Sequence, residues 1–167
     1  KGLERSQQMF SDLNRHAVKP SRSLGLLYEH RNDEAKVAKL IAINSKAFSG
    51  LIEMERSSLS ERSRKLFTLS AIATACSSLL ERLETKDFEE THQKCEEYWN
   101  AIAEQFDDWD NVRQTRLLSA EVRRDKIHSH AIILQCLGIV GSQLLAEFPK
   151  DWKSKLPKLK TIDWSRN

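Results

Sequence analysis

Apolar residues recur every three or four positions along most of the chain, which is the spacing of one face of an α-helix. One such repeat covers residues 66–83 and a second covers residues 88–106. Ser60 and Thr85 precede these repeats, and hydroxyl side chains are favoured as helix N-caps. We therefore predict a long helix that begins after Ser60 and another that begins after Thr85.

Shorter helices are predicted towards the N-terminus. Residues 3–13 carry apolar side chains at helical spacing. Ser21 or Ser23 is a suitable N-cap for a second helix, and Asn32 is one for a third. Pro20 separates the first two helices, because proline disfavours helical conformation at the residue before it. The short apolar stretch at residues 51–54 predicts at most one short strand.

Residues 129–148 are apolar on nearly every side of the predicted helix. A helix of this kind is usually buried on all sides at the centre of a bundle. We therefore expect an all-α fold, a multi-helix bundle of about six to eight helices around this buried central helix.

Composition supports a single folded unit. The chain has 167 residues, and a domain typically has about 100–200. Five glycines and three prolines are too few for a turn-rich β-sandwich or barrel. A run of about 18 apolar residues, as a membrane span requires, is missing, and the polar first residues contain no signal-peptide core. We expect a cytoplasmic protein that does not interact with membranes.

The net charge of +3 conceals an uneven distribution along the chain. Residues 1–80 carry a net charge of +5, residues 81–110 carry −8, and residues 111–167 carry +6. Such blocks form partner surfaces in some proteins and solvated helix faces in others, and the second is the more common case.

The three cysteines do not predict a metal site or a disulfide framework. Cys76, Cys95 and Cys136 lie 19 and 40 residues apart, without a second Cys or His at the short spacing of zinc ligands. Cys76 and Cys136 stand in apolar runs, so we expect both to be buried as small hydrophobic residues.

Other metal and catalytic patterns are equally weak. Asp107, Asp108 and Asp110 lack the spacing of a calcium loop, so a helix cap at a solvated corner is expected. His128 and His130 lie two residues apart, which directs them to different sides of a helix. Glycine-rich phosphate loops and nucleophile motifs are missing from the sequence. We therefore expect no metal, no cofactor and no enzymatic activity.

Basic residues give the strongest functional signal. One cluster surrounds the start of the helix after Ser21, where free backbone N–H groups and cations would favour a phosphate. A second contains Arg113, Arg116, Arg123, Arg124, Lys126, His128 and His130, and a third contains Arg56, Arg62, Arg64 and Lys65. The candidate DNA-binding residues are Arg15, His16, Lys19 and Arg22 from the first cluster, and Arg113, Arg116, Arg123, Arg124 and Lys126 from the second.

Several stretches resemble a known family. Residues 5–28, with the sequence RSQQMFSDLNRHAVKPSRSLGLLY, are similar to the later part of a DGQHR domain, which belongs to a ParB-like group. Residues 60–72 (SERSRKLFTLSAI), 106–109 (FDDW) and 121–148 resemble the DndB family of DNA sulfur modification proteins. The Asp-Gly-Gln-His-Arg motif of that family does not occur in the chain and is expected upstream of Lys1, which implies a fragment of a longer protein.

The resemblance implies two regions and a function. Residues 1–30 would be the tail end of a DGQHR/ParB-like domain and residues 31–167 a helical domain packed with it. The family resemblance implies a bacterial DNA-binding transcriptional regulator of the phosphorothioate system, in which sulfur replaces a non-bridging phosphate oxygen of DNA. Its expected partner is promoter DNA of the modification genes.

Two alternatives stay open. In the first, the chain is a protein–protein interaction subunit of the sulfur modification machinery without direct DNA contact, with other modification proteins or a second copy as partners. In the second, the portion upstream of Lys1 handles nucleotides as an enzyme, although these residues contain no recognisable active site.

Overall fold

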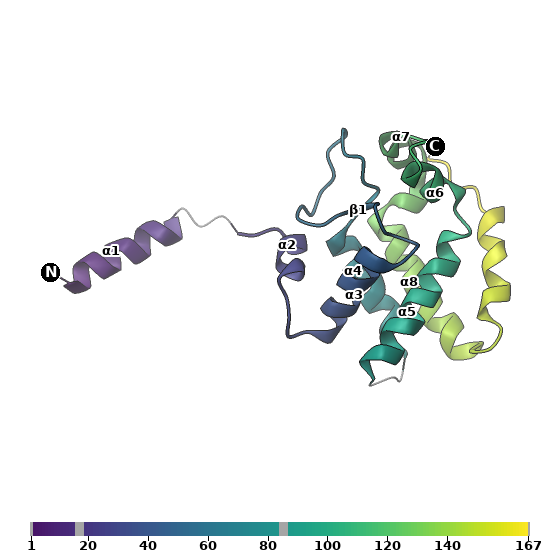
Figure 1. The fold of residues 1–167 in the computed structure, drawn as a ribbon, viewed down its shortest axis with the longest axis horizontal. Coiled ribbons are helices and arrows are strands. Elements are labelled where there is room, and N and C mark those ends of the chain that lie inside the picture. The colour runs from purple at the N-terminus through teal and green to yellow at the C-terminus, as the bar shows by residue number, and fades with distance from the viewer. Residues whose placement is uncertain (1, 16–18, 84–86, 167) are drawn as a thin grey trace.

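The structure is a computed structural model that describes residues 2–15, 19–83 and 87–166. Its elements are, in order, α1 (Gly2–Arg15), α2 (Arg22–Leu27), α3 (Asp33–Asn44), β1 (Ile52–Glu53), β2 (Phe67–Thr68), α4 (Leu69–Leu80), α5 (Phe88–Ala103), α6 (Asp107–Arg113), α7 (Ser119–Asp125), η1 (Ile127–Ser129), α8 (Ala131–Glu147) and η2 (Trp152–Thr161), where η marks a 3₁₀-helix. Helices α2 to α8 and η2 gather into a globule from which α1 projects (Figure 1). The predicted all-α multi-helix fold is confirmed.

Helices α4 and α8 form the centre of the globule, and glycines on α8 allow their close approach. A Cβ atom at Gly138 would lie 2.3 Å from the backbone oxygen of Ala75 on α4. A Cβ atom at Gly141 would lie 2.3 Å from the ring of Tyr98 on α5. A side chain at Gly138 would push α8 away from α4, and one at Gly141 would push α8 away from Tyr98 of α5, so the packing around α8 depends on both glycines.

Aromatic side chains from distant parts of the chain complete the core. The ring centroids of Phe48 and Phe67 are 5.5 Å apart, and those of Phe67 and Trp109 are 4.9 Å apart. Trp99 of α5 lies 5.3 Å from Phe48. These contacts, each worth about 0.5–1.5 kcal/mol beyond area burial, join β2, α5 and α6 around the segment after α3.

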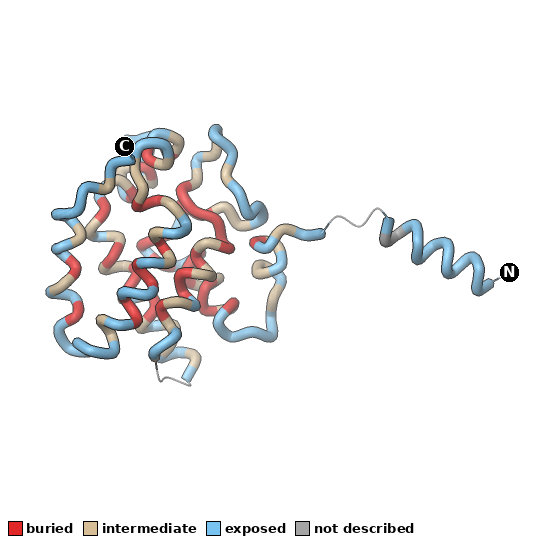
Figure 2. The backbone as a smooth tube through the Cα atoms, turned by 180° about the vertical axis from the view of Figure 1, so that it is seen from behind, coloured by how far each residue is buried: buried red, intermediate tan, exposed pale blue. Residues whose placement is uncertain are grey.

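The expectation that the helix near residues 129–148 is buried on all sides is wrong. Leu134, Leu137 and the two glycines of α8 are buried, but Ile132 is 62% exposed and Ile139 is 42% exposed. Figure 2 shows α1 exposed at residues 2–12 and 15, whereas buried segments concentrate inside the globule. Helix α8 is central in the packing but is covered on one face only.

The helix predicted from the apolar repeat at residues 66–83 is present as α4, but its predicted start after Ser60 is wrong, and the prediction of at most one strand needs correction. Residues 54–66 form a loop without regular secondary structure, and α4 begins only at Leu69, with the Thr68 side chain accepting from the backbone N–H of Ala71. Strand β1 lies where a strand was expected, and it pairs in parallel with β2 through Ile52 opposite Phe67.

Two predicted N-caps are confirmed. The side chain of Ser21 accepts from the backbone N–H of Leu24 at 3.0 Å, and that of Asn32 accepts from Ala35 at 3.0 Å. Thr85 lies outside the described residues. Helix α5 has Asp87 as its observed N-cap.

None of the helices within the described residues is long and apolar enough to cross a bilayer.

Candidate functional site

The loop between the two strands, residues 54–66, connects two parts of the surface that are far apart in sequence, and we call it the bridging loop. Its first residues lie against the start of α2. The Ser21 hydroxyl donates to the backbone oxygen of Glu55, and the backbone N–H of Ser23 donates to Ser57 Oγ at 3.1 Å. In Figure 1 the loop rises above β1, between α2 and α7.

The other end of the bridging loop is held by α7. The guanidinium of Arg123 donates to the backbone oxygens of Lys65 at 3.0 Å, Ser60 at 2.9 Å and Glu61 at 3.1 Å. The Ser119 hydroxyl donates to Ser63 O at 2.6 Å. Burial lowers the pKa of Arg123, but from a value high enough that the side chain stays charged. Arg123 therefore fixes the loop conformation with charge-assisted hydrogen bonds.

These contacts link the segments that carry members of the three predicted basic clusters, namely the start of α2, the loop itself and α7. Lys19 and Arg22 are exposed at the start of α2, and Arg124 is exposed on α7. Between them the bridging loop carries the exposed residues Arg56, Arg62 and Arg64. We call this set the bridging surface (Lys19, Arg22, Arg56, Arg62, Arg64 and Arg124).

The remaining predicted DNA-binding residues differ in their surroundings. Arg15 is exposed at the end of α1, and His16 lies outside the described residues. Arg113 is engaged by the protein, since its guanidinium donates to the backbone oxygens of Lys46 and Ala47 and pairs with Asp110 at 2.9 Å.

Two further members of the second cluster differ in burial. Arg116 is exposed in the turn before α7. Lys126 is half-buried and forms an isolated antiparallel bridge with Ser165. The structure thus separates cations that hold the fold, such as Arg113 and Arg123, from cations that face solvent.

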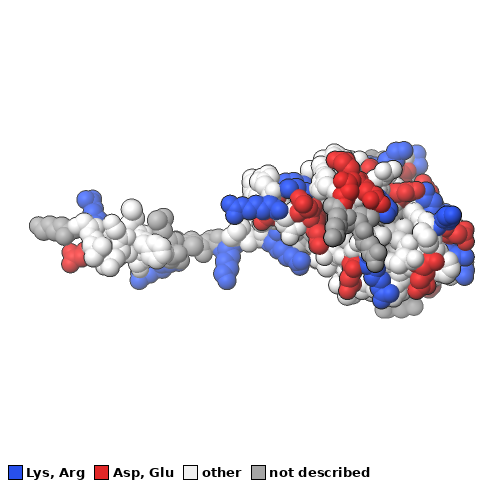
Figure 3. Space-filling view, turned by 90° about the horizontal axis from the view of Figure 1, so that it is seen from below, with Lys and Arg blue, Asp and Glu red and all other residues white. Residues whose placement is uncertain are grey.

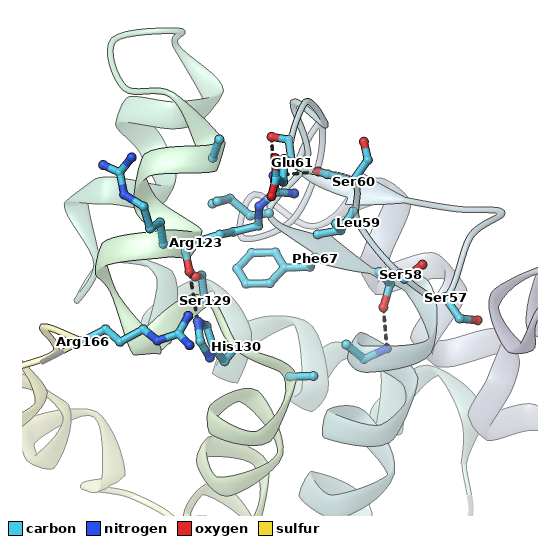
Figure 4. A pocket seen from close by; sticks show the side chains of 16 residues that line it. Ser57, Ser58, Leu59, Ser60, Glu61, Phe67, Arg123, Ser129, His130 and Arg166 are labelled. Carbon is cyan, nitrogen blue, oxygen red and sulfur yellow. Dashed lines mark hydrogen bonds between the residues drawn. The ribbon is translucent and has the colours of Figure 1, made fainter.

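A pocket of about 690 Å³ opens beside the bridging loop. Four segments supply its lining: the loop and β2, α7, the residues before α8, and the C-terminal segment. The lining residues are Ser57, Ser58, Leu59, Ser60, Glu61, Leu66, Phe67, Thr68, Ala71, Ala120, Arg123, Arg124, Ser129, His130, Ala131 and Arg166. Figure 4 shows Arg166 extending from the C-terminal segment towards His130 and Ser129, with Ser57, Ser58 and Ser60 of the loop on the opposite side.

Backbone hydrogen bonds hold the C-terminal segment in place and so position the Cα atom of Arg166. The Arg166 backbone N–H donates to Asp125 O at 2.8 Å, and the backbone N–H of Ile127 donates to Trp164 O at 2.9 Å. Sequence reasoning missed Arg166 and the pocket serines, because their proximity arises from contacts across about a hundred residues, which no local spacing reveals.

The acidic corner after α5 contains no cation site in the described residues. Asp108 Oδ2 lies 3.0 Å from His128 Nε2, and Asp110 pairs with Arg113. Groups of three or more potential metal-ligating side chains are missing from the described part of the chain. Phe106, and not an aspartate, occupies the N-cap position of α6, so the aspartates belong to the first turn and the predicted cap is wrong.

The expectation that Cys76 and Cys136 are both buried is confirmed for Cys76 and wrong for Cys136. Cys76 and Cys95 are buried, with their Sγ atoms 3.6 Å apart, but Cys136 is exposed on the outer face of α8. The expectation for Cys136 failed for the same reason as the prediction that α8 is buried on all sides.

Fold and site together describe an all-α protein with a cationic bridging surface and a pocket lined by serine and arginine. The chain belongs to the DndB family, described as DNA-sulfur modification-associated, because the family model matches residues 1–167, the whole chain. No curated protein and no solved structure matches the chain. Family membership confirms the resemblance seen in the sequence and associates the chain with the DNA sulfur modification system.

Proposed function

We propose that this chain is a DNA-binding transcriptional regulator of the phosphorothioate modification genes, and that it contacts promoter DNA mainly through phosphates. One observation carries the proposal: the bridging loop joins basic residues from α2, the loop and α7 into one surface. The guanidiniums of Arg62 and Arg64 make no hydrogen bond or ion pair with described residues, so both are available to a phosphate. Phosphate contacts supply most of the sequence-independent affinity for DNA.

The distribution of acidic residues supports the same orientation. Helix α5 carries Glu89 and Glu90 in its first turn, and both lie in the block of net charge −8. Figure 3 views the molecule from below and shows acidic side chains over the globule with Lys and Arg side chains between them. The exposed carboxylates of the acidic block would repel a polyanion, so we expect the polyanion to meet the bridging surface instead.

A salt titration tests the proposal directly. Binding of a fluorescent promoter duplex is measured by anisotropy between about 50 and 200 mM salt, a range over which phosphate contacts weaken strongly. The double variant Arg62→Ala/Arg64→Ala should bind more weakly and with a smaller salt dependence. The log–log slope should decrease by about 0.9 for each phosphate that the variant no longer neutralises.

The matched control is Lys158→Ala/Lys160→Ala, which removes the same charge from η2. Helix η2 lies at the edge of the globule opposite α2 (Figure 1). The control should retain the salt slope of the unaltered chain. Absence of binding by the unaltered chain, or binding that does not change with salt, would exclude the proposal.

A second candidate function is a protein-interaction subunit of the modification machinery, and the outer face of α8 favours it. Ile132, Ile139 and Val140 are 62%, 42% and 46% exposed on one helix. Exposed apolar patches of this kind commonly mark protein contacts. Pull-down with the other modification proteins, combined with light scattering for self-association, separates this candidate from the first. Both candidates are binding proteins of the bacterial cytoplasm and neither requires an enzymatic activity.

A further inference from the structure

The pocket beside the bridging loop has two walls of different chemistry. One wall carries the guanidinium of Arg166, which is a donor for an anion, next to His130, whose Nε2 donates to the backbone oxygen of Arg123 at 3.0 Å. The other carries Leu59, Leu66 and Phe67, which are apolar. A ligand that fills both would need a negatively charged group and a flat apolar ring in one molecule.

Arg166 is the cation best placed to bind such a ligand. Its backbone is anchored by the hydrogen bond to Asp125 O, yet its guanidinium has no hydrogen bond or ion pair with the described residues. Arg123 at the same pocket is instead occupied by loop carbonyls, and Arg124 pairs with Asp125 at 2.7 Å. The pocket thus combines Arg123, which the loop holds, and Arg124, which is exposed beside Asp125, with Arg166, whose guanidinium has no partner among the described residues.

We propose that this pocket binds one nucleotide unit, with its phosphate on the side of Arg166 and His130 and its base on the side of Leu59 and Phe67. The volume of about 690 Å³ lies within the range of about 300–1,000 Å³ that small-ligand pockets occupy. The unit is either a free mononucleotide or an unpaired nucleotide of a DNA strand. This inference rests on the proposed function, because the pocket adjoins the bridging surface.

Calorimetric titrations of the whole chain with four probes test the free-nucleotide form. The probes are deoxyadenosine 5′-monophosphate, deoxyadenosine, inorganic phosphate and a fully paired duplex. The monophosphate should bind at least about tenfold more tightly than the nucleoside or phosphate alone, since only it engages both walls. Arg166→Ala should weaken monophosphate binding by at least about tenfold, while Lys158→Ala, an exposed position on η2 outside the pocket, should leave it unchanged.

A second variant separates the two walls. Leu59→Ser should weaken binding of the monophosphate but not of inorganic phosphate. If the monophosphate binds no better than inorganic phosphate and Leu59→Ser has no effect, the site takes a bare anion and the proposal is wrong. If Arg166→Ala binds as well as the unaltered chain, the proposal is also wrong.

The DNA-borne form is tested with a duplex that carries one unpaired adenine, compared with the fully paired duplex. Preference for the unpaired adenine, abolished in Arg166→Ala, supports the proposal with DNA as the source. Binding of neither the monophosphate nor the unpaired adenine overturns it. Salt-dependent binding of the paired duplex would still support the proposed function, so the two failures are distinguishable.

Discussion

At the scale of single residues, His128 shows how burial fixes a protonation state. Its Nδ1 accepts from Trp109 Nε1–H at 3.1 Å, so the ring proton lies on Nε2, which faces Asp108 Oδ2 at 3.0 Å. Burial lowers the pKa of His128, and the hydrogen bond to Asp108 opposes this shift only in part. A second proton on Nδ1 would face the Trp109 N–H and break that hydrogen bond.

The direction of this pKa shift predicts a pH-dependent stability. The unfolded chain takes up the proton near pH 6.5, whereas the folded chain does so only at lower pH. Below about pH 6.5 the unfolded state therefore binds more protons, and the free energy of unfolding falls as the pH decreases towards the folded pKa. Urea unfolding from pH 8 to pH 5 should show this loss in the unaltered chain.

The variant His128→Gln tests whether His128 causes this loss of stability at low pH. His128→Gln should be less stable at pH 8 by about 1–3 kcal/mol, because buried hydrogen-bond partners are left unsatisfied, but it should lose less on acidification. His30→Gln, at an exposed position, should behave like the unaltered chain. An unchanged pH profile in His128→Gln would assign the acid sensitivity to other groups.

The cysteines allow a prediction about reactivity. The buried thiol of Cys95 donates a hydrogen bond to Cys76 Sγ. This hydrogen bond, together with burial, raises the pKa of the Cys95 thiol well above the usual value. Cys136 is exposed. Because the thiolate is the reactive species, a thiol reagent should modify one cysteine rapidly in the folded chain and three after unfolding. Rapid modification of Cys136→Ser would contradict this arrangement.

At the scale of elements, the contact between α4 and α8 depends on glycine. Gly138→Ala would place a methyl group 2.3 Å from a backbone oxygen, which cannot move without shifting α4. We expect a loss of about 1–3 kcal/mol in the free energy of unfolding, as for overpacked cores. Gly25→Ala in α2 meets no atom within 4 Å and should be neutral or slightly stabilising. Equal effects of the two substitutions in thermal unfolding would refute the close contact.

The bridging loop depends on a single side chain of α7. Arg123→Ala removes the donors to Ser60, Glu61 and Lys65, so amide exchange in the loop should accelerate and DNA affinity should decrease. Arg124→Ala removes an equal charge from the neighbouring residue, which makes no hydrogen bond to the loop. Amide exchange in the loop should therefore stay slow in this variant. Fast exchange in both variants would mean that general destabilisation, not the loop contact, is responsible.

The same elements show what the sequence could predict. N-caps at Ser21 and Asn32 were predictable because each is a hydrogen bond over three residues. The loop that follows Ser60 was not predictable, because a hydrogen bond from Arg123, 63 residues further along the chain, stabilises it at Ser60. Hydrophobic periodicity likewise cannot show which faces of α8 find neighbours. In the candidate site, the basic residues could be recognised from the sequence. Their spatial grouping, and the position of Arg166 at the pocket, depend on tertiary contacts that the sequence does not show.

At the scale of the whole molecule, the net charge of +3 conceals an uneven distribution of basic and acidic residues. The basic blocks before residue 81 and after residue 110 are separated in sequence by the acidic block. The bridging loop places parts of both basic blocks on one surface, since it touches Ser21 and Ser23 at one end and Arg123 at the other. If DNA lies along this surface, both ends must contribute to binding.

Arg22 and Arg124 test that requirement from the two ends. Arg22→Ala and Arg124→Ala should each lower the salt slope of DNA binding by about 0.9, and the double variant by about twice that amount. Their free-energy effects should add, because the residues lie on separate elements without a shared partner. Lys150→Ala, an exposed lysine near η2, provides the charge control. An effect of Arg124→Ala alone would confine the DNA contact to α7, because an extended phosphate backbone on the whole surface must meet both arginines.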